Sequence, residues 1–375
     1  MKKEKVLSRN IKILQISMGE SYGGLEKLEV EYMKIINNYD IQMDLLLPNV
    51  NALSNRKNDN KKIHILNVTR KTFLGRMKYD YRLYRFLKRN KYDIIHINSS
   101  AFFYSFRVVL ISKLCKVKKI IVHSHGLSPA NKLKKFIIKI LNPIYTKMAD
   151  EYLSCSEKAK KSLFTDKFIN KSKIKILKNG IHIDKYKFNN SLRNKYRNDL
   201  KINNKIVYGH TGRFSKEKNH DYLIDLFYEI QKKQDAVLLL VGEGLLEETI
   251  KQKVKKFNIE DKVLFLGFRN DINVILNAID IFIFPSISEG FGLSVIESQT
   301  NGLITYVSKG IPFESNISPY FKYFDLNDDI EELASRIVKE KIKIEKRNSA
   351  YKYTKKTGYD INDVCKELKY MYLNL

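Results

Sequence analysis

The sequence predicts an α/β protein in which buried parallel strands alternate with helices. Its 375 residues are enough for two such domains, each with a sizeable hydrophobic core. Short apolar runs alternate with helical periods in both halves of the chain. The plainest example is residues 279–302, where an apolar run ends at Pro285, a glycine loop follows, and a helix stops at Asn301-Gly302. Ligands of such folds collect where strands lead into helices, so these loops are the first candidate sites.

Composition indicates a protein of a reducing compartment. The three cysteines are far apart and have no metal-binding spacing. The initial MKKEKVLSRN is charged, but no apolar stretch of signal-peptide length follows it. No segment has the roughly 18 apolar residues of a membrane span. The nearest one, residues 101–115, is interrupted by two basic residues. We therefore expect a cytoplasmic protein.

The positive charge is concentrated in the first half of the chain. Residues 1–187 carry 40 Lys and Arg against 15 Asp and Glu, so +25 of the formal net charge of +28 lies there. Such a half could bind nucleic acid, another polyanion or an anionic membrane surface. A lysine-rich solubilising surface is the alternative. Two basic amphipathic segments, residues 73–90 and 132–146, fit either a packed helix with a solvated cationic face or a helix that lies on a membrane.

The first half predicts a sheet whose first strand leads into a glycine turn. A strand over residues 11–18 is followed by Ser21-Tyr22-Gly23-Gly24, which opens a helix over residues 25–37. Gly23 and Gly24 would let a phosphate or an acceptor approach backbone amides without a Cβ in the way. The other predicted segments are strands over 41–47, 92–98, 119–124, 150–156 and 173–177, a polar loop over 49–62, and helices over 73–90, 101–114, 132–146 and 157–164.

Two histidines flank the carboxyl end of the strand over residues 119–124. These are His123 and His125, and this end of a parallel strand is the crevice side of the sheet. A lone histidine is more often a structural residue than a catalyst. Their position makes both of them candidates.

The second half repeats the alternation and holds two candidate phosphate loops. A strand over residues 205–211 ends at Gly212-Arg213, and Arg213 and Lys218 lie five residues apart around the loop that follows. Both can reach one phosphate group if the loop turns them inward. The strand over 236–242 ends at Gly242 in a Gly-Glu-Gly turn. The other predicted strands are 262–267, 279–284 and, as the last strand, 304–308. One predicted helix begins near residue 219, a second follows the Gly-Glu-Gly turn and ends at residue 257, and two more cover 328–336 and 349–375.

Two glutamates frame the glycine loop after the strand over residues 279–284. Glu289 falls in the loop and Glu297 about one turn into the following helix. A carboxylate accepts two hydrogen bonds from vicinal hydroxyls, which suits a sugar or a ribose. A surface acid and an ordinary helix-face glutamate are the alternative reading, but the spacing and the frame favour a site.

These motifs resemble those of retaining glycosyltransferases of family 4, which have the GT-B fold. The resemblance covers most of the chain and is carried by SYGGLE, KNGIHID, GRFSKEK and EGFGLSVIE. It implies two Rossmann-like domains that face a central cleft, over residues 1–185 and 186–350. The C-terminal helix, residues 351–375, would return to the first domain. One departure is Asn219, which stands where the loop of the family usually has a glycine.

The resemblance also implies a role for each site residue. Glu289 would meet the hydroxyls of the donor sugar and Glu297 the ribose of the donor. Arg213 and Lys218 would hold the diphosphate, and a histidine, His125 ahead of His123, would lie near the reacting anomeric carbon. The catalytic set is thus Glu289, His125, Arg213 and Lys218. The binding set is Gly23, Gly24, Arg213, Lys218, Gly242, Phe268, Arg269, Phe291, Gly292, Leu293 and Glu297, with Phe268 and Arg269 in the wall against the base.

The expected reaction is transfer of a sugar from a nucleotide sugar, with UDP favoured over GDP. Transfer would proceed with retention to a saccharide acceptor, lipid-linked, during capsule or exopolysaccharide synthesis in bacteria. The nucleotide sugar is a co-substrate, so we expect no cofactor. We expect no metal either, because Arg213 and Lys218 would stabilise charge on the leaving diphosphate.

The basic half favours an anionic membrane surface as a partner, at the inner face of the cell membrane, and we expect no nucleic acid. Two other classes of function stay open. One is a nucleotide-sugar epimerase on a similar two-domain fold, and the other is a non-catalytic polyanion-binding protein.

Overall fold

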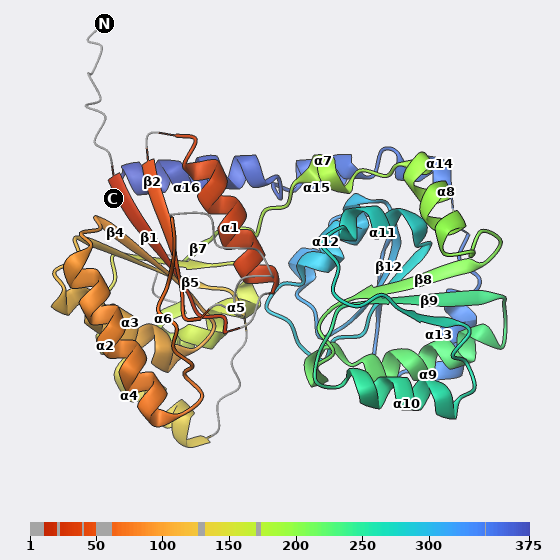
Figure 1. The fold of residues 1–375 in the computed structure, drawn as a ribbon, viewed down its shortest axis with the longest axis horizontal. Helices are drawn as coiled ribbons and strands as arrows, with labels where there is room; N and C mark the ends of the chain where they lie inside the picture. The colour runs from red at the N-terminus through yellow and green to blue at the C-terminus, as the bar shows by residue number, and fades with distance from the viewer. Residues whose placement is uncertain are drawn as a thin grey trace, which may run out of the picture. The chain divides into compact units, whose positions relative to one another are not determined.

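The computed structural model describes residues 11–20, 23–39, 41–49, 62–126, 132–169, 174–341 and 343–375. The chain divides into two compact units, Met1–Gly180 with Ile361–Leu375, and Ile181–Asp360. Each unit is a parallel sheet with helices packed on it, as predicted (Figure 1). The domain boundaries placed at residues 185 and 350 stay predictions. Ser21-Tyr22 and most of the polar loop over residues 49–62 lie outside the described residues.

The first unit contains a seven-stranded parallel sheet. Its strand order is β3-β2-β1-β4-β5-β6-β7, so the chain starts near the middle and builds outward in both directions. Six of the strands correspond to predicted ones. The seventh, β3, was missed because it has only three residues and follows the polar loop. The strands are β1 (Ile11–Ser17), β2 (Ile41–Leu47), β3 (Ile63–Ile65), β4 (Ile94–Ser99), β5 (Lys119–Ser124), β6 (Glu151–Ser154) and β7 (Lys175–Ile176).

Helices cover both faces of this sheet. One face packs against α2 (Phe73–Arg89), α3 (Phe102–Leu114) and α4 (Lys132–Tyr145), around a core that includes Tyr79, Val108 and Tyr145. The other face packs against α1 (Gly24–Ile36) and the C-terminal helix α16 (Ile361–Leu373). Figure 1 shows the first three helices on one side of the sheet and α16 on the other. Two shorter helices follow β6, namely α5 (Glu157–Leu163) and α6 (Asp166–Ile169).

The second unit contains a six-stranded parallel sheet of order β10-β9-β8-β11-β12-β13. The prediction that residues 304–308 form the last strand is wrong, because β13 follows them and pairs with β12. This strand, FKYF, is only four residues long and carries an exposed lysine, so it lacks the apolar run of a buried strand. The strands are β8 (Ile206–Thr211), β9 (Ala236–Val241), β10 (Val263–Phe265), β11 (Ile281–Phe284), β12 (Ile304–Ser308) and β13 (Phe321–Phe324).

The helices of the second unit also form two groups. The core beneath one face of the sheet takes apolar residues from α9 (His220–Gln231), α10 (Glu247–Lys256) and α13 (Ile330–Ile337). A second group packs together through contacts of α12 with α7 and α15 and of α11 with α8. Its members are α7 (Ile183–Tyr186), α8 (Asn190–Asp199), α11 (Ile272–Ala278), α12 (Leu293–Thr300), α14 (Ile344–Arg347) and α15 (Tyr351–Lys356).

None of the helices in the described part of the chain is long and apolar enough to span a bilayer.

A buried carboxylate ties α8 to the centre of the second sheet. Asp280 is 3% exposed and accepts hydrogen bonds from Arg193 and Arg197 of α8. It also accepts a hydrogen bond of 2.9 Å from the backbone N–H of Val207, in β8. Arg347 of α14 is buried nearby and donates to the carbonyl of Ile279 at 2.8 Å. Three arginines are thus buried around one acid, and each of them also donates to a backbone carbonyl.

Replacement of Asp280 should therefore destabilise the second unit strongly. Asp280→Asn keeps the size of the side chain but leaves the buried guanidinium groups without a countercharge. Breaking a buried ion pair in this way costs about 3–5 kcal/mol of unfolding free energy. Urea unfolding followed by circular dichroism measures the loss. The matched control is Asp199→Asn, an exposed acid on the same helix, which should change stability by less than about 0.5 kcal/mol. Equal midpoints for Asp280→Asn and the wild type would contradict this account.

Candidate active site

Three predicted loops of the second unit leave neighbouring strands at the same edge of the sheet. β8 lies between β9 and β11, and all three strands run parallel. The loops after Thr211, Val241 and Phe284 therefore start side by side. They are also joined by backbone hydrogen bonds, because the Gly212 N–H donates to Val241 O at 2.9 Å and the Ile287 N–H donates to Glu217 O at 2.8 Å. The parallel sheet thus places the predicted anion loops next to the predicted sugar loop.

The structure joins two of the predicted residues in an ion pair. Lys218 Nζ lies 2.6 Å from Glu289 Oε1, and both side chains are about one-fifth exposed. The ammonium group also lies 4.5 Å from the centre of the Phe284 ring, at the end of β11. The loop that carries Glu289 is held in turn by a hydrogen bond of 3.2 Å from its N–H to Gly310 O. A lysine has three N–H donors, so this pair leaves Lys218 two donors for another ligand.

Arg213 lies on the same loop but outside this ion pair. Its side chain is exposed, and the ion pair is formed by Lys218 and Glu289 alone among the described residues. Its positive charge is one of the causes that lower the pKa of Glu217, after hydrogen bonds from the Glu217 backbone and from Ser215. The structure thus leaves the guanidinium accessible to solvent and to a ligand.

Special backbone geometry shapes two of these loops. Gly242 has a φ of +137°, and a Cβ at this position would lie 2.0 Å from the carbonyl oxygen of Gly212. A side chain there would force the two loops apart. Asn219 has a φ of +56° and a ψ of +46°, in the left-handed region. Asparagine is one of the few residue types other than glycine that tolerate this region, which explains why Asn219 can occupy a position where the family usually has glycine.

The glycine loop passes directly into α12. Gly292, with a φ of +89°, precedes the first helical residue, Leu293. Phe291 is buried, its ring lies 5.2 Å from that of Tyr359, and its carbonyl accepts a hydrogen bond of 2.8 Å from Ser315 Oγ. The loop backbone is therefore fixed by its own side chain. Leu293, a member of the predicted binding set, is half-buried.

Glu297 has a partner that the sequence did not reveal. The hydroxyl of Tyr186 donates to Glu297 Oε1 at 2.5 Å, across 111 residues of the chain. Tyr186 belongs to α7, directly after the KNGIHID motif, and is itself buried. This hydrogen bond fixes one carboxylate oxygen and the direction of the side chain. In the sequence, the only indication of this hydrogen bond is that a tyrosine lies near the KNGIHID motif, and this indication is weak.

Phe268 and Arg269, the two residues predicted to form the wall against the nucleotide base, have different surroundings. Phe268 is 44% exposed, and its N–H donates to Glu243 Oε1 at 3.2 Å. Arg269 forms two hydrogen bonds with Asp271, at 2.8 and 2.7 Å, and these lower the pKa of Asp271. The guanidinium is therefore already engaged within the loop. Glu243, from the Gly-Glu-Gly turn, was not among the predicted site residues.

The glycine turn of the first unit is followed by two buried glutamates in α1. Gly23 caps α1 with an extended backbone, and Gly24 is the first helical residue. Glu26 and Glu29, in the first two turns, are both buried, and Ser17 donates to Glu26 Oε1 at 3.3 Å. Burial and then the nearby Glu26 raise the pKa of Glu29 well above its usual value. The negative charge of Glu26, which disfavours ionisation of Glu29, also disfavours a further anion at this helix N-terminus. This turn therefore suits a hydroxyl-bearing ligand better than a phosphate.

His125 lies at the same edge of the first sheet. Its Nε2 is 2.9 Å from Asn98 Oδ1. An amide oxygen only accepts hydrogen bonds, so Nε2 carries the proton and Nδ1 keeps its lone pair. Nδ1 is buried. Burial lowers the pKa of His125 to about 3, and a hydrogen bond with the Asn179 side chain opposes this shift. The structure therefore presents a neutral histidine beside Asn179.

His123 is placed for a structural role. It is 1% exposed, and its Nδ1 lies 3.2 Å from His96 Nε2. His96 is in turn bonded at 2.6 Å to the hydroxyl of Tyr372 in α16. Burial lowers the pKa of His96 to about 3 and that of His123 well below its usual value. This chain of neutral groups fastens α16 to the sheet and leaves His125 as the histidine at the sheet edge.

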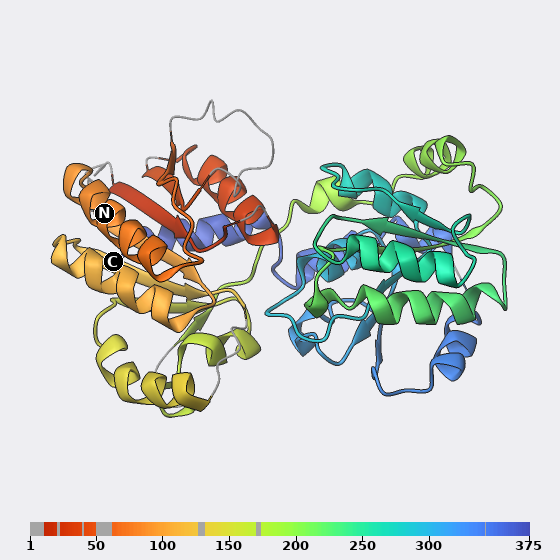
Figure 2. The same cartoon turned by 60° about the horizontal axis from the view of Figure 1, so that its bottom comes forward.

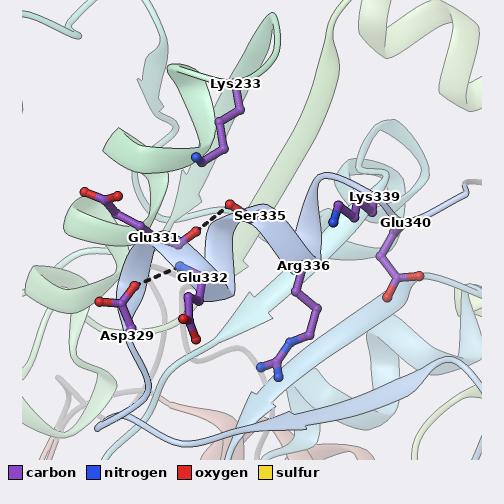
Figure 3. Close-up of a pocket in the computed structure, with 8 residues that line it drawn as sticks. All are labelled: Lys233, Asp329, Glu331, Glu332, Ser335, Arg336, Lys339 and Glu340. Atoms are coloured by element: carbon purple, nitrogen blue, oxygen red, sulfur yellow. Dashed lines mark hydrogen bonds between the residues drawn. The ribbon is translucent and has the colours of Figure 1, made fainter.

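A separate pocket of about 710 Å³ lies elsewhere on the second unit (Figure 3). It is lined by charged residues of α13 and its neighbours and contains none of the predicted site residues. Figure 3 shows Asp329 and Glu331 bonded back to their own helix turns. All the residues that line this surface hollow are charged or polar, and we do not assign the site to it.

The hydrogen bond from His125 to Asn98 predicts a single protonation state. His125 should stay neutral, with its proton on Nε2, from pH 8 to pH 5, because its folded pKa lies below this range. Long-range ¹H–¹⁵N spectra of histidine-labelled protein distinguish the two tautomers. Asn98→Leu removes the acceptor and should let the proton redistribute between the ring nitrogens, while Asn90→Leu, at the exposed end of α2, should not. Protonation of His125 near pH 6.5 in the wild type would contradict the assignment.

Comparisons with known proteins agree with this arrangement. The sequence matches the family described as "Glycosyltransferase Family 4" over residues 23–185 and the family described as "Glycosyl transferases group 1" over residues 193–357. The two matches lie in succession and together extend over most of the chain.

Several transferases are similar in sequence. A UDP-Gal:alpha-D-GlcNAc-diphosphoundecaprenol alpha-1,3-galactosyltransferase of Escherichia coli is 26% identical over 313 residues, which are 80% of this chain and 79% of that one. A 4-alpha-N-acetylgalactosaminyltransferase of Campylobacter jejuni, named for an N-acetylgalactosamine-N,N'-diacetylbacillosaminyl-diphospho-undecaprenol substrate, is 32% identical over 44% of this chain and 42% of its own. The capsular polysaccharide biosynthesis glycosyltransferase CapM of Staphylococcus aureus is 30% identical over 44% and 45%.

Solved structures show the same fold. The structure of HepE of Anabaena in complex with UDP superposes with a TM-score of 0.75 at 19% identity, over 97% of this chain and 100% of that one. WaaG, described as a glycosyltransferase involved in lipopolysaccharide biosynthesis, superposes with a TM-score of 0.69 at 14% identity, over 96% and 99%. The two parallel α/β units, the ordered motifs and these matches show that the chain is a glycosyltransferase with a family 4 domain followed by a group 1 domain, in the GT-B fold.

Proposed function

We propose that this glycosyltransferase moves a sugar from a UDP-sugar, with retention of configuration, to a lipid-linked saccharide during synthesis of a bacterial surface polysaccharide. Two similar transferases support this acceptor class, because their names specify saccharides on diphosphoundecaprenol. UDP is supported as the nucleotide because the Escherichia coli relative is named for UDP-Gal and HepE was solved with UDP.

The observation that carries the proposal is the ion pair between Lys218 and Glu289. It joins the cationic loop after β8 to the glycine loop after β11, at adjacent strand ends. A nucleotide sugar has the matching chemistry, since its sugar offers hydroxyl donors and its diphosphate offers anionic oxygens. Glu289 would accept from the hydroxyls, while the remaining donors of Lys218 and the open guanidinium of Arg213 would meet the diphosphate. These two loops together can thus bind both the sugar and the diphosphate of the donor.

The remaining groups would orient the donor. The N–H groups of Phe291, Gly292 and Leu293 open α12, and such N–H groups point toward a ligand at a helix start. Glu297, directed by Tyr186, would accept from the ribose hydroxyls. With Arg269 paired to Asp271, recognition of the base would rest on the Phe268 ring and the loop backbone.

In the reaction the bond from the anomeric carbon to the diphosphate oxygen breaks, and the acceptor oxygen bonds to that carbon on the same face. The acceptor proton passes to the leaving diphosphate, so no carboxylate nucleophile is needed. Lys218 and Arg213 would stabilise the charge that grows on the diphosphate, which is the role of a divalent ion in other transferases. By the family resemblance, the neutral His125 would lie near the reacting sugar. The place of the reaction would be the cytoplasmic face of the membrane, where a lipid-linked acceptor is held.

Replacing Lys218 should reduce turnover without unfolding the protein. In Lys218→Ala the diphosphate loses a charged donor, and Glu289 is left as an uncompensated negative charge beside it. Loss of one such electrostatic contact lowers turnover by about a hundredfold. Release of nucleoside diphosphate, measured with EDTA present, reports the reaction. Lys216→Ala removes an exposed lysine of the same loop and should act like the wild type.

The double variant Lys218→Ala with Glu289→Gln separates the two causes. It should bind the nucleotide sugar more tightly than Lys218→Ala alone, because the uncompensated negative charge is gone. Thermal shifts with UDP-, GDP-, ADP- and dTDP-sugars measure this and name the donor. Wild-type turnover in Lys218→Ala would refute the diphosphate role. If none of the four donors stabilises the wild type, the donor site itself is wrong.

A further inference from the structure

The outer surface of α4 carries an apolar stripe that the protein core does not use. Leu133, Phe136, Ile140 and Ile144 recur at helical spacing, and each is more than half exposed. The inner side of the helix is occupied by other residues, which include the buried Tyr145. The helix is therefore apolar on two sides, although only one side packs against the sheet.

A second stripe of the same kind runs along α2. Phe73, Leu74, Met77 and Tyr81 are all more than half exposed. Basic groups lie over the exposed tyrosines of this helix, because the Arg85 guanidinium is 5.7 Å from the centre of the Tyr81 ring.

The helix α3 joins the two stripes into one layer. Arg107 of α3 pairs with Asp80 of α2 at 2.8 Å, and Ser105 of α3 bonds to Tyr145 of α4 at 2.5 Å. Figure 2 shows the three helices, coloured from orange to yellow, side by side. Leu110 and Leu114 of α3 are exposed between the two stripes. Of the 13 exposed large apolar residues in the described part of the first unit, 11 lie on this layer, so the exposure is not scattered.

The same layer concentrates positive charge. The sequences of α2, α3 and α4 hold 12 Lys and Arg and one acid, Asp80, which is already paired with Arg107. Long basic side chains that flank an apolar stripe can extend their charged ends outward while the stripe is covered. The surface thus offers apolar insertion and cationic contact together.

We propose that the layer of α2, α3 and α4 docks on an anionic lipid bilayer, with the apolar stripes of α2 and α4 inserted among the headgroups. Amphipathic helices with basic flanks lie in the interface plane in this manner. A second copy of the chain is a poorer occupant, because two such faces would oppose 12 basic groups to 12. Nucleic acid would satisfy the charges but would leave Leu133 and Ile140 in water. Anionic lipid satisfies both.

This inference deepens the proposed function, on which it rests for its purpose, because it names the face that would hold the enzyme beside a lipid-linked acceptor. Its test needs no acceptor. Binding of the full chain to vesicles is measured by flotation, with phosphatidylcholine alone or with about 30% phosphatidylglycerol added, a content chosen to give an anionic surface. We expect binding only to the anionic vesicles.

Matched variants separate insertion from simple charge. Lys134→Gln, Lys135→Gln and Lys139→Gln together should reduce the vesicle-bound fraction relative to free protein by roughly a hundredfold, from three lost basic groups. Their control is Lys195→Gln, Lys255→Gln and Lys256→Gln, three exposed lysines of the second unit. The pair Leu133→Gln and Phe136→Gln should reduce binding at least about tenfold. Their control pair is Leu245→Gln and Phe313→Gln, which are more exposed than Leu133 and Phe136 but lie in the second unit.

The chain contains no tryptophan, so the fluorescence of an introduced tryptophan reports how deeply its position inserts into the bilayer. Phe136→Trp introduces a single indole in the α4 stripe, and Phe313→Trp introduces one in the second unit. With anionic vesicles the first should show a blue-shifted emission that brominated lipid quenches, and the second should show neither.

Three results would overturn the docking surface. They are equal binding to neutral and anionic vesicles, unchanged binding of Leu133→Gln with Phe136→Gln, and no spectral change at position 136. Stronger retention by RNA than by anionic vesicles would also overturn it, in favour of a polyanion surface. Thermal stabilisation by a UDP-sugar is measured on the same samples. If the UDP-sugar stabilises the protein but the vesicles do not bind it, the docking proposal is wrong and the proposed function stands. If the vesicles bind the protein but no UDP-sugar stabilises it, the docking proposal stands and the proposed function is wrong.

Discussion

The second unit depends on one buried carboxylate. Asp280 stands directly before β11, accepts from the backbone of β8, and pairs with two arginines of α8. β8 and β11 are the two strands whose far ends carry the cationic loop and the glycine loop. A carboxylate buried among three guanidinium groups is stable only if its geometry is kept, because each unpaired charge in the interior costs several kcal/mol. The rigidity that aligns these two loops therefore originates at the opposite end of the strands.

The two candidate regions differ in their electrostatic character, which favours a different kind of ligand for each. In the second unit an exposed arginine and a paired lysine are set for an anion. In the first unit the groups at the sheet edge are a protonation-prone glutamate, Glu29, and a neutral histidine, His125. A diphosphate gains little from such an environment, whereas sugar hydroxyls can both donate to it and accept from it. We therefore propose that the diphosphate of the donor binds to the second unit and a neutral saccharide to the first.

Local motifs could be predicted from the sequence, but the pairings between them could not. The loops with Lys218 and Glu289 were found because each lies between a buried strand and a helix. Their ion pair joins residues 71 positions apart, and the Tyr186 bond to Glu297 joins residues 111 apart, so both arise from the packing of the sheet. The strands β3 and β13 were missed because three or four residues with a polar member have no periodicity to detect.

The sequence also left two readings of the basic helices open, because a periodic pattern does not say what lies on each side of a helix. In α4 the residues that face the sheet, including Asn142 and Tyr145, are buried, while Phe136 and Ile140 on the outside are exposed. The helix therefore has a core face and a second apolar face, and the two readings were not exclusive. The other face of the same sheet, under α1 and α16, is closed by Leu368 and Tyr372. The first unit thus has one face that its own C-terminal helix covers and one whose helices expose apolar and basic groups together. Much of the positive charge of the first half therefore lies on the helices of one face of the sheet. Composition alone could not show this location.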